Sequence, residues 1–272
     1  MKVVALLGVR NEALYLPICL EHLYRQGVET CVIDNGSTDK SKDIARSFIG
    51  RGVFRIDDIP YNGQYEWEVI LKYKEKLALE LDADWFIHHD ADEIREAPIP
   101  YKDLLQGIEN ADNKGFNAIN FDEFVFLPAA PDEHFEGKDF LKEMRYYYYF
   151  NKRPLHRVNA WKKTMLKIDL ATSGGHRVVF DGQKICPEHF ILRHYIALSK
   201  EHLIKKYSTR AYSRREVNEL GWHTERAGFD ANKLIMPNKE ELKQLSADGN
   251  WDRSDPWKDH KMFNYNGYKD VQ

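Results

Sequence analysis

The residues VVALLGVRNE at positions 3–12 decide the fold class of this chain. The first seven form an unbroken apolar run, which is typical of a strand buried on both faces of a parallel sheet. The run stops at Arg10, and Asn11 and Glu12 then open a helix that Gly27 ends. A buried strand that leads directly into a helix indicates an α/β fold.

The alternation of strand and helix continues to residue 95 with short loops. It predicts a Rossmann-like, mostly parallel sheet with helices on both faces. Beyond residue 95 the alternation weakens, and the absence of internal repeats or a low-complexity linker favours a single domain with an embellished C-terminal third. The expected elements are strands at 30–33, 53–56, 85–87, 116–126, 146–151, 157–163, 178–180 and 190–194, and helices at 40–49, 65–81, 200–207 and 213–220.

Composition narrows the classes of partner. The chain has 272 residues, 43% of them hydrophobic, and a net charge of -3, so it can bury a large core and carries no basic field for nucleic acid. Its three cysteines lack zinc or redox spacing and fit a reducing compartment. We find no signal peptide and no apolar run of about 20 residues, so we expect a cytoplasmic protein without a transmembrane segment. Peripheral association with a membrane stays open.

Polar side chains stand where the expected strands end. Arg10, Asp34, Asp57 and Asp90 each follow an apolar run. In parallel α/β sheets, ligands bind beyond the carboxyl ends of the strands. The sequence therefore predicts a ligand site at this edge.

Asp90-Ala91-Asp92 comes directly after the apolar strand at 85–87. Carboxylates two residues apart in a turn can both reach one hard cation, and Mg²⁺ or Mn²⁺ accepts one or two carboxylates together with substrate phosphates. Such a cation would neutralise a diphosphate leaving group. Asp-x-Asp also occurs in ordinary surface loops, but its position at a strand end favours a metal site.

Asp34-Asn35-Gly36-Ser37 allows two interpretations. Asp34 and Asn35 stand where directed hydrogen bonds could read a base or a ribose. The same residues could form an Asx turn that caps the next helix, which is the interpretation we favour for residues 37–39. Arg10-Asn11-Glu12 is equally open, because Arg10 suits a nucleotide contact but also a salt bridge at the surface.

The segment VRNEALYLPICLEHLYRQGVETCVIDNGSTDKS at residues 9–41, followed by DWFIHHDADEI at 84–94, resembles the family 2 type of glycosyltransferase, which has the GT-A fold. His194-Tyr195 and the later Ser199 resemble a bacterial subgroup of that family. The resemblance implies a nucleoside-diphosphate-sugar donor, often UDP-linked, and a divalent metal at Asp90-Ala91-Asp92. Many family members carry two acids where this chain has Asp34-Asn35, so base identity is not carried over.

The resemblance also assigns roles to single residues. A late histidine completes the metal shell in similar enzymes, although a lone histidine is more often structural. An inverting transfer needs a carboxylate base, for which Glu188 is favoured by its place downstream, while Asp122 and Glu123 could equally line the acceptor site. The expected sets are Gly8, Arg10, Glu12, Asp34, Asn35, Asp90 and Arg193 for the nucleotide, Asp90, Asp92 and His194 for Mn²⁺ or Mg²⁺, and Glu188, Asp122 and Glu123 for catalysis.

These inferences predict a hexosyltransferase-like enzyme that moves a sugar from its nucleotide donor to a hydroxyl of a glycan or lipid-linked acceptor, with inversion. We expect one domain over 1–272, with a nucleotide-binding half at 1–95, an acceptor and metal half at 96–200, and a helical extension at 201–272. A sugar nucleotidyltransferase would carry a Gly-rich basic loop, which residues 8–12 match poorly. A non-catalytic nucleotide-sugar-binding module is the other alternative, and Asp90 and Asp92 argue against it.

Overall fold

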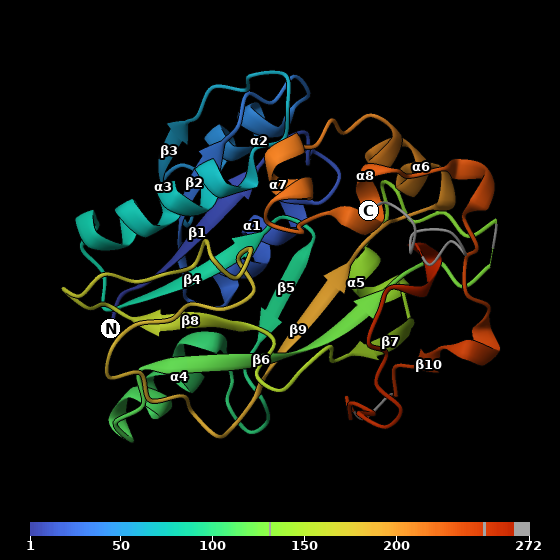
Figure 1. Ribbon diagram of the computed structural model, residues 1–272. Coiled ribbons are helices and arrows are strands. Elements are labelled where there is room, and N and C mark those ends of the chain that lie inside the picture. The colour runs from blue at the N-terminus through green and yellow to red at the C-terminus, as the bar shows by residue number, and fades with distance from the viewer. Residues whose placement is uncertain (131, 247–248, 264–272) are drawn as a thin grey trace. The chain divides into compact units, whose positions relative to one another are not determined.

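The computed structural model describes residues 1–130, 132–246 and 249–263 (Figure 1). The chain forms two compact units. The first consists of Met1–Tyr61, Trp67–Asp122 and Leu155–Arg193, and the second of Asn62–Glu66, Glu123–Pro154 and the chain from His194 onward. The chain passes from one unit to the other within two strands, β6 (Ala118–Phe126) and β9 (Phe190–Tyr195). Each compact unit is made of segments that are separated along the chain, so the units do not correspond to the ranges 1–95, 96–200 and 201–272. Those ranges stay a prediction about function.

A parallel sheet forms the centre of the first unit. β1 (Val3–Val9) pairs with β2 (Glu29–Asp34) on one side and with β4 (Trp85–Asp90) on the other, and β3 (Val53–Asp58) pairs with β2. β8 (Val158–Lys162) joins β4 in the antiparallel sense, and the start of β6 pairs with β8. The predicted parallel α/β sheet is confirmed.

Helices cover this sheet on two faces. In Figure 1, α3 (Trp67–Glu80) lies in front of the strands and α1 (Leu16–Arg25) behind them. α1 buries Leu16, Cys19, Leu20 and Leu23, whose spacing of three and four residues makes one apolar stripe. α2 (Ser41–Ser47) and α4 (Leu104–Asn113) complete the unit, and the short strand β5 (Glu93–Glu96) pairs with β9.

Two expectations about elements in the first unit were wrong. The first helix begins at Leu16 and not at Asn11, because Asn11 has φ 56° and its side chain accepts a hydrogen bond from the backbone N–H of Thr38 at 2.8 Å. Residues 178–180 form no strand, since Val179 makes only an isolated antiparallel bridge with Asp169. Asn11 has a left-handed backbone conformation, so it cannot be the first residue of a right-handed helix. The single bridge of Val179 is too short to count as a strand.

The second unit is built on a short antiparallel sheet. β7 (Tyr146–Phe150) pairs with the end of β6 and with β10 (Lys243–Gln244). The predicted helices are confirmed as α6 (Lys200–Ser208) and the shorter α7 (Arg214–Asn218). The remaining elements are α5 (Phe140–Glu143), α8 (Thr224–Ala227), η1 (Ala231–Lys233), η2 (Lys239–Glu241) and η3 (Lys261–Phe263).

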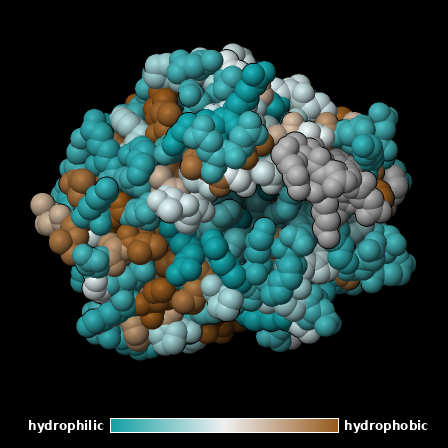
Figure 2. Space-filling view, viewed as in Figure 1, coloured by the Kyte–Doolittle hydropathy of each residue, from teal (hydrophilic) through white to brown (hydrophobic). Residues whose placement is uncertain are grey.

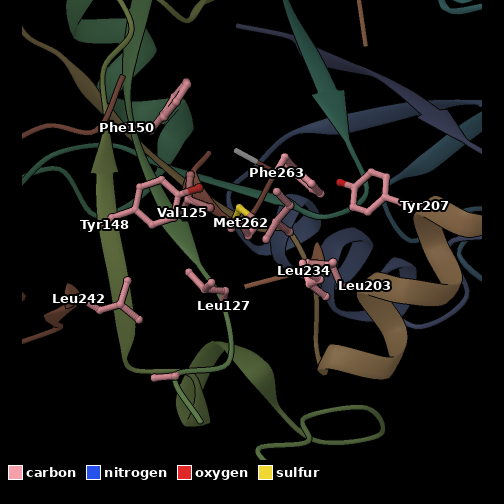
Figure 3. Close-up of a cluster of buried hydrophobic side chains, with 13 residues drawn as sticks. Val125, Leu127, Tyr148, Phe150, Leu203, Tyr207, Leu234, Leu242, Met262 and Phe263 are labelled. Carbon is pink, nitrogen blue, oxygen red and sulfur yellow. The ribbon is translucent and has the colours of Figure 1, made fainter. Parts of the chain in front are cut away.

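The core of the second unit joins β7 to the last described residues. Figure 3 shows Tyr148 from β7 and Tyr207 from α6 with Met262 and Phe263 between them. Trp257 stacks on Tyr148 with ring centroids 4.1 Å apart. Trp257, Met262 and Phe263 therefore tie the described part of the tail to the core, although the sequence of the tail shows no periodicity.

Hydrophobic residues also reach the surface of the first unit. In Figure 2 they lie mainly on the left of the viewed face. Among the large hydrophobic side chains that the structure describes, the most exposed is Met165, in the turn after β8, with 85% of its surface accessible. Leu166 beside it is 51% accessible. In the part of the chain that the structure describes, no helix is long and apolar enough to cross a membrane.

Candidate functional site at the strand ends

Three of the predicted site residues meet at one edge of the sheet. Asp34 is the partner of Val9 across β1 and β2, and Asp90 is the partner of Gly8 across β1 and β4. Neighbouring strands lie about 4.8 Å apart, so the two aspartates are separated by about 10 Å, with the end of β1 between them. Arg10 is the residue that follows β1, and this convergence agrees with the sequence pattern.

The turn after β2 presents hydrogen-bond acceptors. Oδ2 of Asp34 accepts from the backbone N–H of Ser37 at 3.0 Å, which is the expected Asx turn. The amide nitrogen of Asn35 donates to the carbonyls of Ile59 at 3.3 Å and Pro60 at 3.2 Å. Oδ1 of Asp34 and Oδ1 of Asn35 are buried and have no hydrogen-bond partner among the described residues. Oδ1 of Asp34 and Oδ1 of Asn35 are therefore the two atoms of this turn that could accept hydrogen bonds from a ligand.

Arg10 holds this turn in place. Its Nη1 donates to the carbonyls of Asn35 and Gly36, both at 2.7 Å, and its guanidinium lies 3.2 Å from the centre of the Tyr61 ring. Gly36 has φ 63°, and a Cβ there would come within 3.0 Å of Tyr61. Arg10 is thus an internal support of the turn, bonded to its carbonyls, and no sequence pattern pointed to Tyr61.

The loop from β1 to α1 interlocks with the same turn. The backbone N–H of Asn11 donates to Oγ of Ser37 at 3.1 Å, and that of Glu12 donates to Oγ of Ser41 at 2.8 Å. Glu12 therefore lies in this loop and contributes a backbone bond. These two hydrogen bonds hold the loop after β1 and the segment after β2 together at the edge of the candidate site.

A buried polar network supports Asp90 from behind. The backbone N–H of Asp90 donates to Oε2 of Glu93 at 3.2 Å. Nη1 of Arg95 donates to the same oxygen at 2.5 Å and to Nδ1 of His89 at 2.7 Å, and Nη2 reaches Oδ1 of Asn159 at 3.1 Å. These bonds support the turn that follows β4, although Nε2 of His89 and Nε of Arg95 are buried without a hydrogen-bond partner among the described residues.

Asp90 also has a buried cation beside it. Nζ of Lys74 lies 3.6 Å from Oδ1 of Asp90 and 3.0 Å from both Nδ1 of His88 and the carbonyl of His89. Burial raises the pKa of Asp90 to about 6, against the effect of Lys74, and burial lowers the pKa of Lys74 to about 8. A Cβ at Gly8 would lie 3.5 Å from Nζ, an ordinary van der Waals contact, so Gly8 borders this ammonium.

Sequence reasoning missed Lys74, although a signal exists. Buried positions on α3 include Trp67, Ile70, Leu71, Leu77 and Ala78, and Lys74 falls on the same stripe. A lysine in an apolar stripe is rarely buried without a partner.

The carboxylates of this edge fit a cation. Oδ1 of Asp90 is buried without a hydrogen bond, yet its side chain is 32% exposed, so one carboxylate oxygen faces outward next to the half-buried Asp92. Within residues 1–130, 132–246 and 249–263, no three His, Cys, Asp or Glu side chains form a ready metal cluster. Two carboxylates suit Mg²⁺ or Mn²⁺ only together with oxygens from a ligand such as a phosphate.

The third expected metal ligand belongs to the second unit. Nδ1 of His194 lies 2.7 Å from Oε1 of Glu123, and both residues are buried. Glu123, which we considered as a catalytic base, is therefore the hydrogen-bond partner of His194. This pairing turns Nε2 of the imidazole away from Glu123.

The other two carboxylates lie in the first unit. Oδ1 of Asp122 is 2.9 Å from Nδ1 of His189. Oε2 of Glu188 accepts from the hydroxyl of Tyr101 at 3.0 Å. The backbone of Cys186, two residues earlier, bonds to Ala118 at the start of β6, so Glu188 lies toward the opposite end of the strands from Asp34 and Asp90.

Arg193 was expected at a phosphate. Its Nη2 lies 2.9 Å from Oε1 of Glu96, and its Nε donates to Oε2 of the same residue at 3.1 Å. A two-point contact of this kind holds the guanidinium firmly. A phosphate contact would have to share Arg193 with Glu96.

Residues 6–65, which hold the second half of β1, β2 and β3 with Arg10, Asp34 and Asn35, match the model of glycosyl transferase family 2. No curated protein matches the chain. Among solved structures, S. aureus TarS 1-349 is similar with a TM-score of 0.47 and 11% identity over 77% of this chain and 63% of that one. TarS 1-349 in complex with UDP gives 0.48 and 10% over 86% and 77%.

Glucosyl-3-phosphoglycerate synthase from Mycobacterium tuberculosis, in complex with Mn²⁺, UDP and glucosyl-3-phosphoglycerate, is a more partial match. Its TM-score is 0.30 and its identity 17%, over 46% of this chain and 44% of that one. Against a longer TarS structure, this chain spans 41% of the length.

Proposed function

From the family 2 match over residues 6–65, which supports a family 2-like glycosyltransferase, we propose that this protein transfers a sugar from a nucleoside-diphosphate-sugar to a hydroxyl of a glycan or lipid-linked acceptor, on a GT-A-type fold. One observation carries the proposal: Asp34 and Asn35 each keep a buried oxygen without a hydrogen bond to any described residue, and Asp90, on the other side of β1, has a carboxylate that is 32% exposed. Buried acceptors are normally paired, so a ligand that offers hydrogen-bond donors at Asp34 and Asn35, and phosphates that share a cation with Asp90, is the natural partner.

The polarity of the β2 turn favours one group of bases. Because Ile59 and Pro60 occupy the amide nitrogen of Asn35, this side chain can only accept from a ligand. Uracil, thymine and guanine each present a ring N–H donor on their pairing edge, whereas the ring nitrogen of cytosine is an acceptor there and cytosine donates only through its exocyclic amine. Ribose hydroxyls can donate to Asp34. We propose a UDP-sugar as the favoured donor.

Asp90 and Asp92 would hold Mn²⁺ or Mg²⁺ together with the donor phosphates. When bound, the cation would neutralise the charge of the leaving diphosphate. We propose His194 as a further ligand through Nε2, with Glu123 as the carboxylate that orients the ring; such carboxylate–histidine pairs are usual around protein-bound metals. This role replaces that of a base for Glu123.

For an inverting transfer, we propose Asp122 with His189 as the base. A carboxylate paired with an imidazole is a common proton acceptor. Asp122 is buried, and the side chain of His189 is 36% exposed, so the imidazole is the member of the pair that reaches solvent. Glu188, which the sequence pattern favoured, lies toward the opposite end of the strands from Asp90 and accepts from the hydroxyl of Tyr101, so we do not propose it as the base.

The decisive experiment is calorimetric titration of UDP and CDP, each with Mn²⁺ and with a chelator, followed by an assay of UDP-sugar hydrolysis. We expect UDP to bind more tightly than CDP, and Asp90→Ala to remove the effect of Mn²⁺. Asp57→Asn is the matched control, because this strand-end carboxylate is already engaged by Arg55 at 2.7 Å and Tyr73 at 2.9 Å.

Equal affinity for UDP and CDP would contradict the acceptor arrangement at Asn35. If Asp57→Asn also removed the effect of Mn²⁺ on UDP binding, the effect would not be specific to Asp90, and the assignment of the metal to Asp90 would fail. Binding of UDP-sugars without hydrolysis or transfer would return the protein to the class of binding modules.

A further inference from the structure

Lys74 is a fully buried lysine that no catalytic step uses. Its side chain is 0% exposed, and its ammonium stands 5.2 Å from the ring of Trp67, beside the ends of β1 and β4. Two of its contacts, Nδ1 of His88 and the carbonyl of His89, lie at hydrogen-bond distance. The third neighbour is Oδ1 of Asp90 at 3.6 Å. Burying an ammonium costs free energy unless it is paired, so these three neighbours fix the position of Nζ.

We propose that Lys74 is a positioning residue of the donor site: its ammonium holds Oδ1 of Asp90 inward, so that the other carboxylate oxygen faces the metal and the donor phosphates. The inference rests on the proposed function and deepens it. Lys74 acts through Asp90, because a fully buried Nζ cannot itself reach a bound donor.

The geometry gives the physical reason. Oδ1 of Asp90 is buried without a hydrogen bond from any described residue, and the positive charge of Lys74 is what offsets its lost hydration. Without the ammonium, this oxygen would gain by turning toward water, since the side chain is already 32% exposed. Such a rotation would remove the carboxylate from its fixed direction at the end of β4. Gly8 belongs to the same arrangement, because a side chain there would contact Lys74.

The test is a double-mutant cycle on the binding of UDP with Mn²⁺, measured by calorimetry on the full chain. Lys74→Met removes the charge and keeps the apolar stem, and Lys74→Gln keeps a donor for the carbonyl of His89. Lys76→Met is the matched control, because Lys76 lies on the same helix, is 62% exposed and pairs with Glu80 at 3.5 Å.

We expect Lys74→Met and Lys74→Gln to weaken binding of UDP with Mn²⁺ about tenfold, the lower end of what supporting residues of a metal site contribute. In the background of Asp90→Asn, the same Lys74 substitutions should have no further effect, because their route runs through Asp90. Lys76→Met should bind as the unmodified protein does. If Lys74→Met does not fold, Lys74→Gln decides the cycle.

Each other outcome is informative. If the unmodified protein binds UDP and the Lys74 variants bind equally well, the positioning role is refuted and the proposed function stands. Additive losses in the double variants would show that Lys74 acts independently of Asp90, which also overturns the role. If the unmodified protein binds no nucleoside diphosphate, the proposed function and the positioning role fall together.

Discussion

His194 and Glu123 form a buried pair in the second unit, with Nδ1 of the imidazole 2.7 Å from Oε1 of the carboxylate. Through this contact Glu123 fixes the orientation of the imidazole ring and therefore the direction in which Nε2 points. Residues that orient a metal-binding histidine typically change metal affinity by 10- to 100-fold.

We therefore expect Glu123→Gln to weaken the binding of UDP with Mn²⁺ by about tenfold and to leave binding in chelator unchanged. Calorimetric titration under both conditions is the measurement. Glu143→Gln, an exposed glutamate on α5, serves as the control. Equal losses with and without Mn²⁺ would assign Glu123 to the fold alone.

The contacts of Asn35 predict an unusual cost for a conservative change. Asn35→Asp would place a carboxylate oxygen against the carbonyls of Ile59 and Pro60, where the amide now donates. We expect the free energy of unfolding to fall by about 1–3 kcal/mol, the cost of an unpaired buried polar group. Denaturant unfolding measures it, with the exposed Asn113→Asp as reference. Equal effects of the two changes would mean that the amide bonds contribute little.

Glu75 on α3 anchors the segment after β8. Its Oε1 accepts from the backbone N–H groups of Leu170 at 2.8 Å and Ala171 at 2.9 Å, in a buried position. Glu75→Ala leaves both groups unpaired, and we expect it to lower the free energy of unfolding by about 2–4 kcal/mol. Glu80→Ala, an exposed position of the same helix, should cost about 0.5 kcal/mol or less. Similar costs for both, in urea unfolding, would rule out the anchoring role.

His223 makes the stability of the second unit depend on pH. Burial first, and then Arg226 and Arg210, lower its pKa to about 3. The unfolded chain, in which the histidine pKa is about 6.5, therefore binds more protons between these two values, and stability falls as the pH is lowered through about 6.5. Between about pH 7.5 and pH 5.5 the loss should be about 1 kcal/mol.

Replacing this histidine should remove that share of the pH dependence. Denaturant unfolding of His223→Gln across the same pH range is the measurement, with His134→Gln as control, since the His134 side chain is 55% exposed. The prediction fails if His223→Gln keeps the full pH slope of the unmodified protein.

Much of the first unit could be read from sequence because its signals are local. The run at Val3–Val9 can only be satisfied inside a parallel sheet, and strand ends in such a sheet always meet at one edge. That is why Arg10, Asp34 and Asp90 were brought together correctly. α4 carried a readable signal that was missed: Asp103 caps it by accepting from the N–H of Gln106 at 2.8 Å, and Leu104, Ile108 and Ala111 make its buried stripe.

The partner of each polar side chain was decided by the tertiary structure alone. Asn35 became an acceptor only because Ile59 and Pro60 take its nitrogen, and Glu123 became the partner of a histidine 71 residues away. β5 is four residues long, three of them charged, and it is a strand because β9 pairs with it. The spacing of apolar residues along the chain shows which face of an element is buried. A hydrogen bond can join two residues far apart in the sequence, and no local pattern marks them as partners. The sequence thus determined which side chains gather at one edge of the sheet, and the fold determined the partner of each of them.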